Sequence, residues 1–227
     1  MDDHTSGCSS GRGTLLIHVR AHHRAPGAAA HDTATGALNG ISSAPVTDEL
    51  PSFRYHPDPL ATGSVIRSSA VCRNCGRERG YIYRGPVVAE EDLAGQLCPW
   101  CIADGSAAER LGAEFVDPAA VGDYGAWSPV PSSVAEEVAR RTPGFTGWQQ
   151  ERWWTHCGDA AEYLGRAGHA ELVTRWAAAA AVIRADAHME GERWDGYLRA
   201  LHAEGSPTAY VFRCRHCGQL GGYSDSH

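Results

Sequence analysis

Apolar residues recur at helical spacing in the last third of the chain. Between residues 169 and 187 they lie three or four positions apart, which is the spacing of one helix face. Residues 190–203 repeat this pattern with Trp194, Leu198 and Leu201. Two amphipathic helices are therefore predicted. The tryptophans expected in the core of the helical part are Trp148, Trp153, Trp154, Trp176 and Trp194.

Helix start signals occur twice ahead of these stretches. Ser133 and Glu136 have the spacing of a capping box, and a Thr-Pro-Gly sequence follows where the helix they begin should end. Asp159 and Glu162 have the same spacing. A second, short helix that ends at Gly165 is therefore predicted.

Short alternating stretches predict strands in three places. Residues 64–71, SVIRSSAV, are interpreted as a strand that leads into a cysteine pair. Residues 81–88, YIYRGPVV, alternate around a Gly-Pro turn and predict a hairpin. Residues 208–223, TAYVFRCRHCGQLGGY, predict a strand, a cysteine turn and a second strand.

Composition divides the chain into three parts. Residues 1–48 are rich in Gly, Ala, Ser, Thr and His and show no sustained period, so a disordered tail is predicted. A Pro- and Gly-rich linker at 117–131 separates the two remaining parts. The predicted fold class is α+β, with a zinc-ribbon or treble-clef-like cysteine unit over 50–117. A helical part over 131–223 follows and ends in a cysteine-bearing β-hairpin, and a core shared by the two parts is compatible with this division.

Charge and hydropathy narrow the classes of function. A net charge of -7 argues against a protein that coats nucleic acid or an anionic membrane through its overall field. No apolar run approaches the roughly 18 residues that a membrane-spanning helix needs, so no membrane partner is expected. The predicted location is the cytoplasm. In a reducing compartment, paired cysteines hold metal or do redox chemistry more often than they form structural disulfides.

The cysteines are placed in pairs. Eight cysteines scattered at random would give about 0.3 Cys-x-x-Cys pairs, and this chain has three. The first and last pairs each precede a glycine, which tolerates positive φ and lets backbone N–H groups face the sulfur atoms. The middle pair opens a predicted short helix, whose N-terminal amides stabilise thiolate charge. One tetrahedral, all-thiolate Zn²⁺ site is predicted from the first two pairs. Its ligands are Cys72, Cys75, Cys98 and Cys101.

The last pair needs further ligands to close a second site. Cys157 is the other cysteine of the folded region, with His156 beside it and Asp159 two residues on. A second zinc held by Cys157, Cys214, Cys217 and one of these neighbours is predicted. His156 is included among the predicted ligands, although consecutive ligands strain a tetrahedron. The alternative is a terminal pair that holds no metal.

The sequence CPWC ahead of a helix also resembles the active pair of thioredoxin-like redox proteins. Such folds need a βαβ unit upstream, and here another cysteine turn and a predicted hairpin precede the pair. Redox chemistry is therefore a weaker interpretation than metal binding, and a disulfide framework is weaker still.

Arginines gather around the first cysteine turn of an otherwise acidic chain, with Tyr81 and Tyr83 between them. Basic and aromatic side chains in this mixture hold phosphates and stack bases, so nucleic acid is one partner considered. The simpler interpretation is that the arginines balance the charge of the thiolate cluster. These residues are Arg73, Arg77, Arg79 and Arg84.

Six stretches of the chain resemble one bacterial family. They are FRYHPDPLATGSV, VCRNCG, RGYIYRGPV, LCPWCIADGSAAERLGAEFVD, RTPGFTGWQQERWWTHCGDAAEYLG and SPTAYVFRCRHCG, within residues 50 to about 223. On these residues the chain resembles the CbrC family, named after a protein associated with colicin tolerance. The resemblance implies a cytoplasmic bacterial protein and supplies no catalytic residue.

The expected function is that of a non-enzymatic, zinc-stabilised interaction module. Four thiolates leave no position on zinc for water or substrate, and the GxSxG, Walker A, GxGxxG and HExxH signatures are absent. An unidentified protein is the expected partner, and the resemblance implies a bacterial stress or colicin-tolerance setting. A zinc-dependent nucleic-acid binder is the first alternative. A zinc enzyme with water at an incomplete second site is the other.

Overall fold

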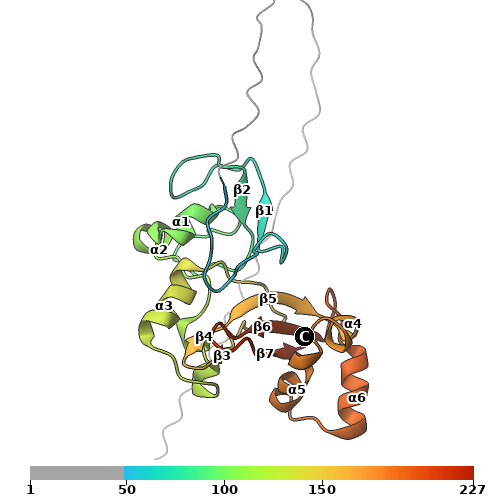
Figure 1. Ribbon diagram of the computed structural model, residues 1–227. Helices are drawn as coiled ribbons and strands as arrows, with labels where there is room; N and C mark the ends of the chain where they lie inside the picture. Colours follow the sequence, from blue (N-terminus) through green and yellow to red (C-terminus); the bar gives the residue numbers. More distant parts are fainter. Residues whose placement is uncertain (1–48) are drawn as a thin grey trace, which may run out of the picture. The chain divides into compact units, whose positions relative to one another are not determined.

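The computed structural model describes residues 49–227. The disordered tail predicted for residues 1–48, which includes Cys8, lies outside these residues. The strands are β1 (Val65–Arg67), β2 (Tyr81–Tyr83), β3 (Thr155–His156), β4 (Asp159–Ala160), β5 (Glu162–Ala167), β6 (Thr208–Arg213) and β7 (Leu220–Asp225). The helices are α1 (Pro99–Ala103), α2 (Ser106–Leu111), α3 (Ser132–Arg141), α4 (His169–Val173), α5 (Ala177–Asp186) and α6 (Gly191–Ala200). Two 3-10 turns, η1 (Pro118–Ala120) and η2 (Asp123–Gly125), precede α3 (Figure 1).

The largest sheet of the described region is antiparallel and has the order β5-β6-β7 (Figure 1). Its middle strand is buried on both faces, since every residue from Thr208 to Phe212 is buried. Side chains alternate along a strand, so Ala209 and Val211 face one core cluster while Tyr210 and Phe212 face another. The predicted strand, cysteine turn and strand at 208–223 are confirmed.

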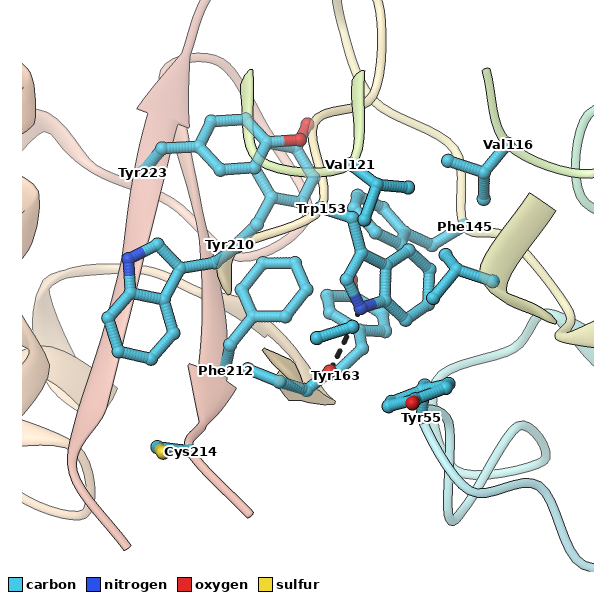
Figure 2. Packing of buried hydrophobic residues seen from close by; sticks show 14 residues of the cluster. Tyr55, Val116, Val121, Phe145, Trp153, Tyr163, Tyr210, Phe212, Cys214 and Tyr223 are labelled. Atoms are coloured by element: carbon cyan, nitrogen blue, oxygen red, sulfur yellow. Dashed lines mark hydrogen bonds between the residues drawn. The ribbon is translucent and has the colours of Figure 1, made fainter. Parts of the chain in front are cut away.

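An aromatic cluster covers one face of this sheet (Figure 2). Phe145 stacks on Tyr163 with ring centroids 4.0 Å apart, and the indole N–H of Trp153 donates a 2.9 Å hydrogen bond to the Ala161 carbonyl. Tyr55, from the extended segment ahead of β1, packs in the same cluster. Residues from both ends of the described chain therefore build one core.

The three C-terminal helices cover the opposite face of the sheet. Leu172, Trp176 and Ile183 pack with Ala209 and Val211 of β6. The single helix predicted for residues 169–187 is wrong, because Thr174 leaves the helical conformation, with φ -125° and ψ -93°, and separates α4 from α5. The helix predicted for 190–203 is confirmed as α6.

The short helix predicted from Asp159 and Glu162 is wrong. Asp159 directs its carboxylate toward distant side chains instead of capping a helix, and β4 and β5 occupy this stretch. Tyr163 and Ala167 alternate with the partly exposed Glu162 and Arg166, which is strand periodicity. The sequence from Glu162 to Ala167 therefore has the alternation of a strand, although Asp159 and Glu162 have the spacing of a capping box.

The hairpin predicted for residues 81–88 is also wrong. β2 pairs with β1, from Val65 opposite Tyr83 to Arg67 opposite Tyr81, and Val88 instead forms a bridge with Glu114. The Gly-Pro step packs under the Tyr83 ring, whose hydroxyl donates a 2.9 Å hydrogen bond to the Pro86 carbonyl. The turn signal therefore marks a bend that holds an aromatic side chain.

Two further predictions concern the segment between β2 and the three-stranded sheet. The helix predicted from Ser133 exists as α3, but Pro131 occupies its N-cap and no side chain caps it. The stretch 117–131, predicted as a linker, contains η1 and η2, and its Val121 is buried and bridges to Trp153.

The fold class of mixed α and β structure is confirmed, with small sheets and short helices. Of the tryptophans expected in the core, Trp153, Trp154, Trp176 and Trp194 are buried, whereas Trp148 is 42% exposed. Within residues 49–227, no helix combines the length and apolarity needed to cross a membrane.

Candidate metal centres

The first two cysteine pairs converge in the structure as predicted. The sulfur atoms of Cys72 and Cys101 lie 3.8 Å apart, those of Cys75 and Cys98 lie 3.9 Å apart, and those of Cys98 and Cys101 lie 3.6 Å apart. A zinc–sulfur bond of about 2.3 Å puts the sulfur atoms of a tetrahedron about 3.8 Å apart. The observed spacing therefore fits one tetrahedral divalent cation.

Two local structures place these four sulfur atoms. The turn from Cys72 to Gly76 is closed by a 2.8 Å hydrogen bond from the Gly76 N–H to the Cys72 carbonyl, with Gly76 at φ +67°. Cys98 is the N-cap of α1, and its N–H donates to the Cys72 sulfur over 3.3 Å. Cys101 then follows within the first turns of α1. The backbone thus directs donors toward the sulfur atoms.

The environment of the first cluster already favours thiolate at one position. A hydrogen bond from the Cys98 thiol, together with backbone N–H groups, lowers the pKa of Cys72 to about 4. The pKa of Cys98 is raised, first because its thiol donates to Cys72 and second because it is buried. These interactions favour the thiolate form at Cys72, which is the form that binds a cation.

The third cysteine pair forms a second cluster with Cys157 and His156. The imidazole Nδ1 of His156 lies 3.1 Å from the Cys157 sulfur and 3.5 Å from the Cys217 sulfur, and the two sulfurs are 3.9 Å apart. Zinc–nitrogen and zinc–sulfur bond lengths predict nitrogen–sulfur separations of about 3.6 Å in a tetrahedron. All four predicted ligands, including Cys214, are therefore together.

A strained turn explains how consecutive residues face the same point. β3 and β4 form a hairpin in which His156 pairs with Asp159, leaving Cys157 and Gly158 as a two-residue turn. Both have positive φ, +54° for Cys157 and +73° for Gly158, as in a type I′ turn. A non-glycine residue in this region is strained, and such strain is concentrated at functional sites. This backbone turns the Cys157 sulfur back toward the His156 ring.

The turn from Cys214 to Gly218 repeats the geometry of the first cysteine turn. The Gly218 N–H donates to the Cys214 carbonyl over 3.0 Å, and Gly218 has φ +75°. Although burial acts in the opposite direction, backbone N–H groups led by that of Cys217 lower the pKa of Cys214 to about 6. Cys214 directly follows β6, so the central strand of the sheet holds this ligand.

Stacking fixes the orientation of the His156 ring. The Trp154 indole lies against it with ring centroids 5.3 Å apart and planes 15° from parallel. Trp154 in turn lies over Gly221 of β7, where any Cβ would overlap the indole ring. Groups that orient a metal ligand in this way commonly control metal affinity.

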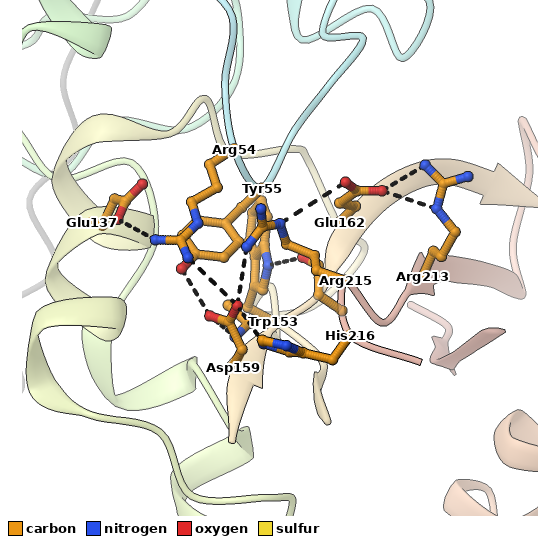
Figure 3. Close-up of polar contacts among 11 residues, drawn as sticks. Arg54, Tyr55, Glu137, Trp153, Asp159, Glu162, Arg213, Arg215 and His216 are labelled. Carbon is orange, nitrogen blue, oxygen red and sulfur yellow. Dashed lines mark hydrogen bonds and ion pairs between the residues drawn. The ribbon is translucent and has the colours of Figure 1, made fainter. Parts of the chain in front are cut away.

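Asp159, the alternative fourth ligand, is occupied by other groups (Figure 3). Its carboxylate accepts a 2.8 Å hydrogen bond from the Tyr55 hydroxyl and contacts Arg215 and His216 over 3.1 Å each. Burial raises the pKa of Asp159, but the hydrogen bonds from Tyr55 and His216 outweigh it, so the pKa lies below the usual value. The Asp159 carboxylate therefore anchors the turn from Cys214 to Gly218.

This anchor was missed in the sequence. Tyr55 and Asp159 are 104 positions apart, and no local pattern links them. Arg215 and His216 lie inside the Cys-x-x-Cys turn itself, which was the available signal. The polar residues between paired ligands thus connect the second cluster to the extended segment that carries Tyr55.

The remaining chemical alternatives can be compared with this geometry. The seven cysteines of the described region are all free thiols, so no disulfide framework is present there. The CPWC pair faces Cys72 and Cys75, and the preceding element is the two-stranded β1-β2 sheet. The arrangement matches a four-sulfur cation site and lacks the βαβ unit of thioredoxin-like folds.

These features define a class: a mixed α and β protein whose described residues contain two separate clusters of four side chains, each able to hold a metal ion. The chain belongs to UPF0167, described as an uncharacterised protein family, whose profile matches residues 50–226. Two mycobacterial relatives, UPF0167 protein Mb2317 of Mycobacterium bovis and UPF0167 protein MT2352 of Mycobacterium tuberculosis, are each 46% identical over 183 residues. For both, the match covers 78% of this chain and 94% of the relative.

UPF0167 protein PA1536 of Pseudomonas aeruginosa is 45% identical over 171 residues, which cover 75% of this chain and 93% of the relative. None of these names states an activity. No solved structure matches the chain.

Proposed function

We propose that this chain is a non-enzymatic protein stabilised by two structural zinc ions, one in each cluster. The first cluster forms part of a zinc-ribbon or treble-clef-like unit, and the second fastens the β3-β4 hairpin to the turn after β6. The protein presents these stapled elements to another macromolecule in the bacterial cytoplasm. The stress or colicin-tolerance setting rests on the resemblance to the CbrC family.

The observation that carries the proposal is the ligand geometry. Each cluster supplies four side chains whose ligand atoms lie within 4.8 Å of one another. Thiolate and imidazole are the ligands that zinc takes in closed structural sites. The elements they join are short, since β3 and β4 have two residues each and α1 has five. Such short elements gain much of their order from a crosslink.

The same geometry argues against a catalytic metal. A catalytic zinc keeps a position for water or substrate, and four protein ligands fill the tetrahedron. In the second cluster His156 supplies the fourth ligand, while Asp159 is held by Tyr55 and Arg215. Neither cluster therefore offers an open position with a free carboxylate beside it.

A nucleic-acid role has less support from the structure. Tyr81 and Tyr83 are 7% and 0% exposed, so their rings are not available to stack on bases. Arg73 pairs with Glu91 over 3.1 Å, and Arg79 lies over the Trp100 ring. The arginines around the first turn thus serve in part to pack and to balance charge.

Elemental analysis of the purified full chain tests the proposal. Two zinc ions per chain are expected, and Cys98→Ser and Cys217→Ser are each expected to lose one. Treatment with a strong chelator should lower the unfolding midpoint, because the free energy of metal binding becomes free energy of folding. A reduced, metal-free chain that unfolds like the untreated protein would refute both sites.

A gel-shift titration with short DNA and RNA at low salt tests the alternative. Binding that weakens with salt and is lost in Arg77→Ala and Arg84→Ala would establish a nucleic-acid function. The proposal expects no shift. Glu78→Ala, next to Arg77 in the chain, is a matched control for loss of structure.

A further inference from the structure

The two clusters differ in how far their sulfur atoms are exposed. In the first, Cys72, Cys98 and Cys101 are at most 2% exposed, and Cys75 is half-buried. In the second, Cys157 and Cys217 are both exposed, whereas Cys214 is buried. Oxidants reach thiolates according to their exposure. The chain therefore carries one shielded site and one open to solutes.

The exposed sulfur atoms of the second cluster are also neighbours. They lie 3.9 Å apart and belong to two separate turns, the β3-β4 turn and the turn after β6. A disulfide needs this separation to fall to about 2.05 Å. Gly158 and Gly218 follow the two cysteines, and a Cβ on either would meet nothing within 4 Å, so both turns border open space. The required movement is confined to two uncrowded turns.

We propose that Cys157 and Cys217 form an oxidation site at which hydroperoxides release the second metal ion. This inference rests on the proposed function, because it takes the second cluster to be metal-loaded. The metal keeps both sulfurs as thiolates, which are the nucleophilic form. The first cluster keeps its ion under the same conditions.

The chemistry balances with hydrogen peroxide as the oxidant. One exposed thiolate attacks a peroxide oxygen, the O–O bond breaks, and a sulfenic acid and hydroxide form. The second thiolate attacks that sulfur and displaces a second hydroxide, which gives the disulfide. Two thiolates are thereby oxidised by two electrons, and the peroxide is reduced to two hydroxide ions. Only His156 and Cys214 would then remain as ligands of the second cluster, too few to hold a zinc ion.

The oxidised state has a defined structural consequence. Loss of the ion would free the His156 ring from ligation, while Trp154 remains its stacking neighbour. A direct disulfide between the two turns would replace the metal-mediated link. The first metal site lies outside the change. The site would thus convert peroxide exposure into a local rearrangement of the two turns, and thiol reductants with zinc would reverse it.

The test uses the full chain loaded with zinc and carrying Cys8→Ser, which removes the cysteine that lies outside the described residues. Zinc is counted before treatment, then its release by hydrogen peroxide is followed with a chromogenic chelator. The remaining thiols are alkylated, and disulfides are located by peptide mapping. We expect two ions at the start, fast release of one, and a Cys157–Cys217 disulfide. Release of the other ion should be at least about tenfold slower, as expected from its buried sulfurs. A dithiol reductant with zinc should restore the first state.

Three outcomes would overturn the inference while leaving two metal sites in place. They are loss of both ions at the same rate, a Cys75–Cys98 disulfide that forms first, and retention of both ions at peroxide concentrations that oxidise a small dithiol. Cys217→Ser should start with one ion and show no fast phase, so a fast phase in this variant would also overturn it. A count below two before peroxide would instead refute the second metal site itself.

Discussion

Replacement of Cys157 by asparagine separates the two roles that the structure gives to this position. Cys157 is one of four side chains that could hold a metal ion, and it has a left-handed backbone conformation with φ +54°. Asparagine followed by glycine is a preferred pair for a type I′ turn, so Cys157→Asn relieves the backbone strain while it removes the ligand. Cys157→Ala removes the ligand and keeps the strain. The two variants therefore differ only in the backbone contribution.

The magnitudes follow from these two contributions. A non-glycine residue in the left-handed region costs roughly 1–2 kcal/mol, and asparagine recovers part of this. The free energy of unfolding of Cys157→Asn should therefore be about 1 kcal/mol higher than that of Cys157→Ala. Zinc at 100 times its dissociation constant stabilises the wild type by about 2.7 kcal/mol, which both variants lose. The expected order of stability is wild type, then asparagine, then alanine.

Urea unfolding in the presence of zinc, followed by circular dichroism, measures all three proteins with the first site loaded. Zinc counts should be two for the wild type and one for each variant. Equal stability of the two variants would refute the role of backbone strain. A variant as stable as the wild type while missing one ion would refute stabilisation by the second metal.

Three further substitutions test other parts of the structure. Burial lowers the pKa of His56 to about 4, so between about pH 6.5 and 4 the unfolded chain binds a proton that the folded chain does not. Stability therefore rises with pH over this range, and acidification from pH 6.5 to 4 costs up to about 3 kcal/mol. His56→Gln should flatten that part of a pH series of urea midpoints relative to wild type; an unchanged slope would contradict the assignment. Gly221→Ala should displace Trp154, cost about 1–3 kcal/mol and weaken zinc binding in competition with a chelator, whereas unchanged affinity would show that stacking does not orient His156. Tyr55→Phe removes the donor to Asp159 and should cost about 1.5–3 kcal/mol in thermal unfolding; no loss would mean that the other partners of the carboxylate suffice.

The first cysteine cluster was predictable because its ligand pairs are local in sequence. Cys72 and Cys75 share one turn, and Cys98 and Cys101 share one helix start. The prediction therefore needed only one contact between segments distant in sequence. The strand, turn and strand that carry Cys214 were also visible in the alternating pattern.

The second cluster depends on long-range packing, and this limited the prediction. His156 and Asp159 are both close neighbours of Cys157 in sequence, and the distant partners of Asp159 leave His156 as the side chain grouped with the three cysteines. The position of His156 beside the cysteines also depends on a turn with two positive φ angles. The pair Cys157-Gly158 is a weaker sequence signal for such a turn than Asn-Gly. The capping signal at Asp159 failed for the same reason, because tertiary hydrogen bonds outcompeted a local one.

The pairing errors have a related cause. The sequence pattern marks Tyr81 and Tyr83 as strand residues but carries no information on which strand lies beside them. Val65 lies opposite Tyr83, and the segment that connects their strands contains the first cysteine turn in place of the short hairpin turn that a Gly-Pro step indicates. The same connection therefore places the first cysteine pair and pairs β1 with β2.

The order of strands in the sheet has a consequence during protein synthesis. β5 and β7 both pair with β6 and not with each other, so β5 has no partner until β6 has been made. The interval from Ala167 to Thr208 is about forty residues, which takes roughly 2–8 seconds at the usual rates of translation. For that time Tyr163 has Phe145 beside it but lacks Phe212 of β6, whose ring centroid lies 5.2 Å from its own in the folded chain.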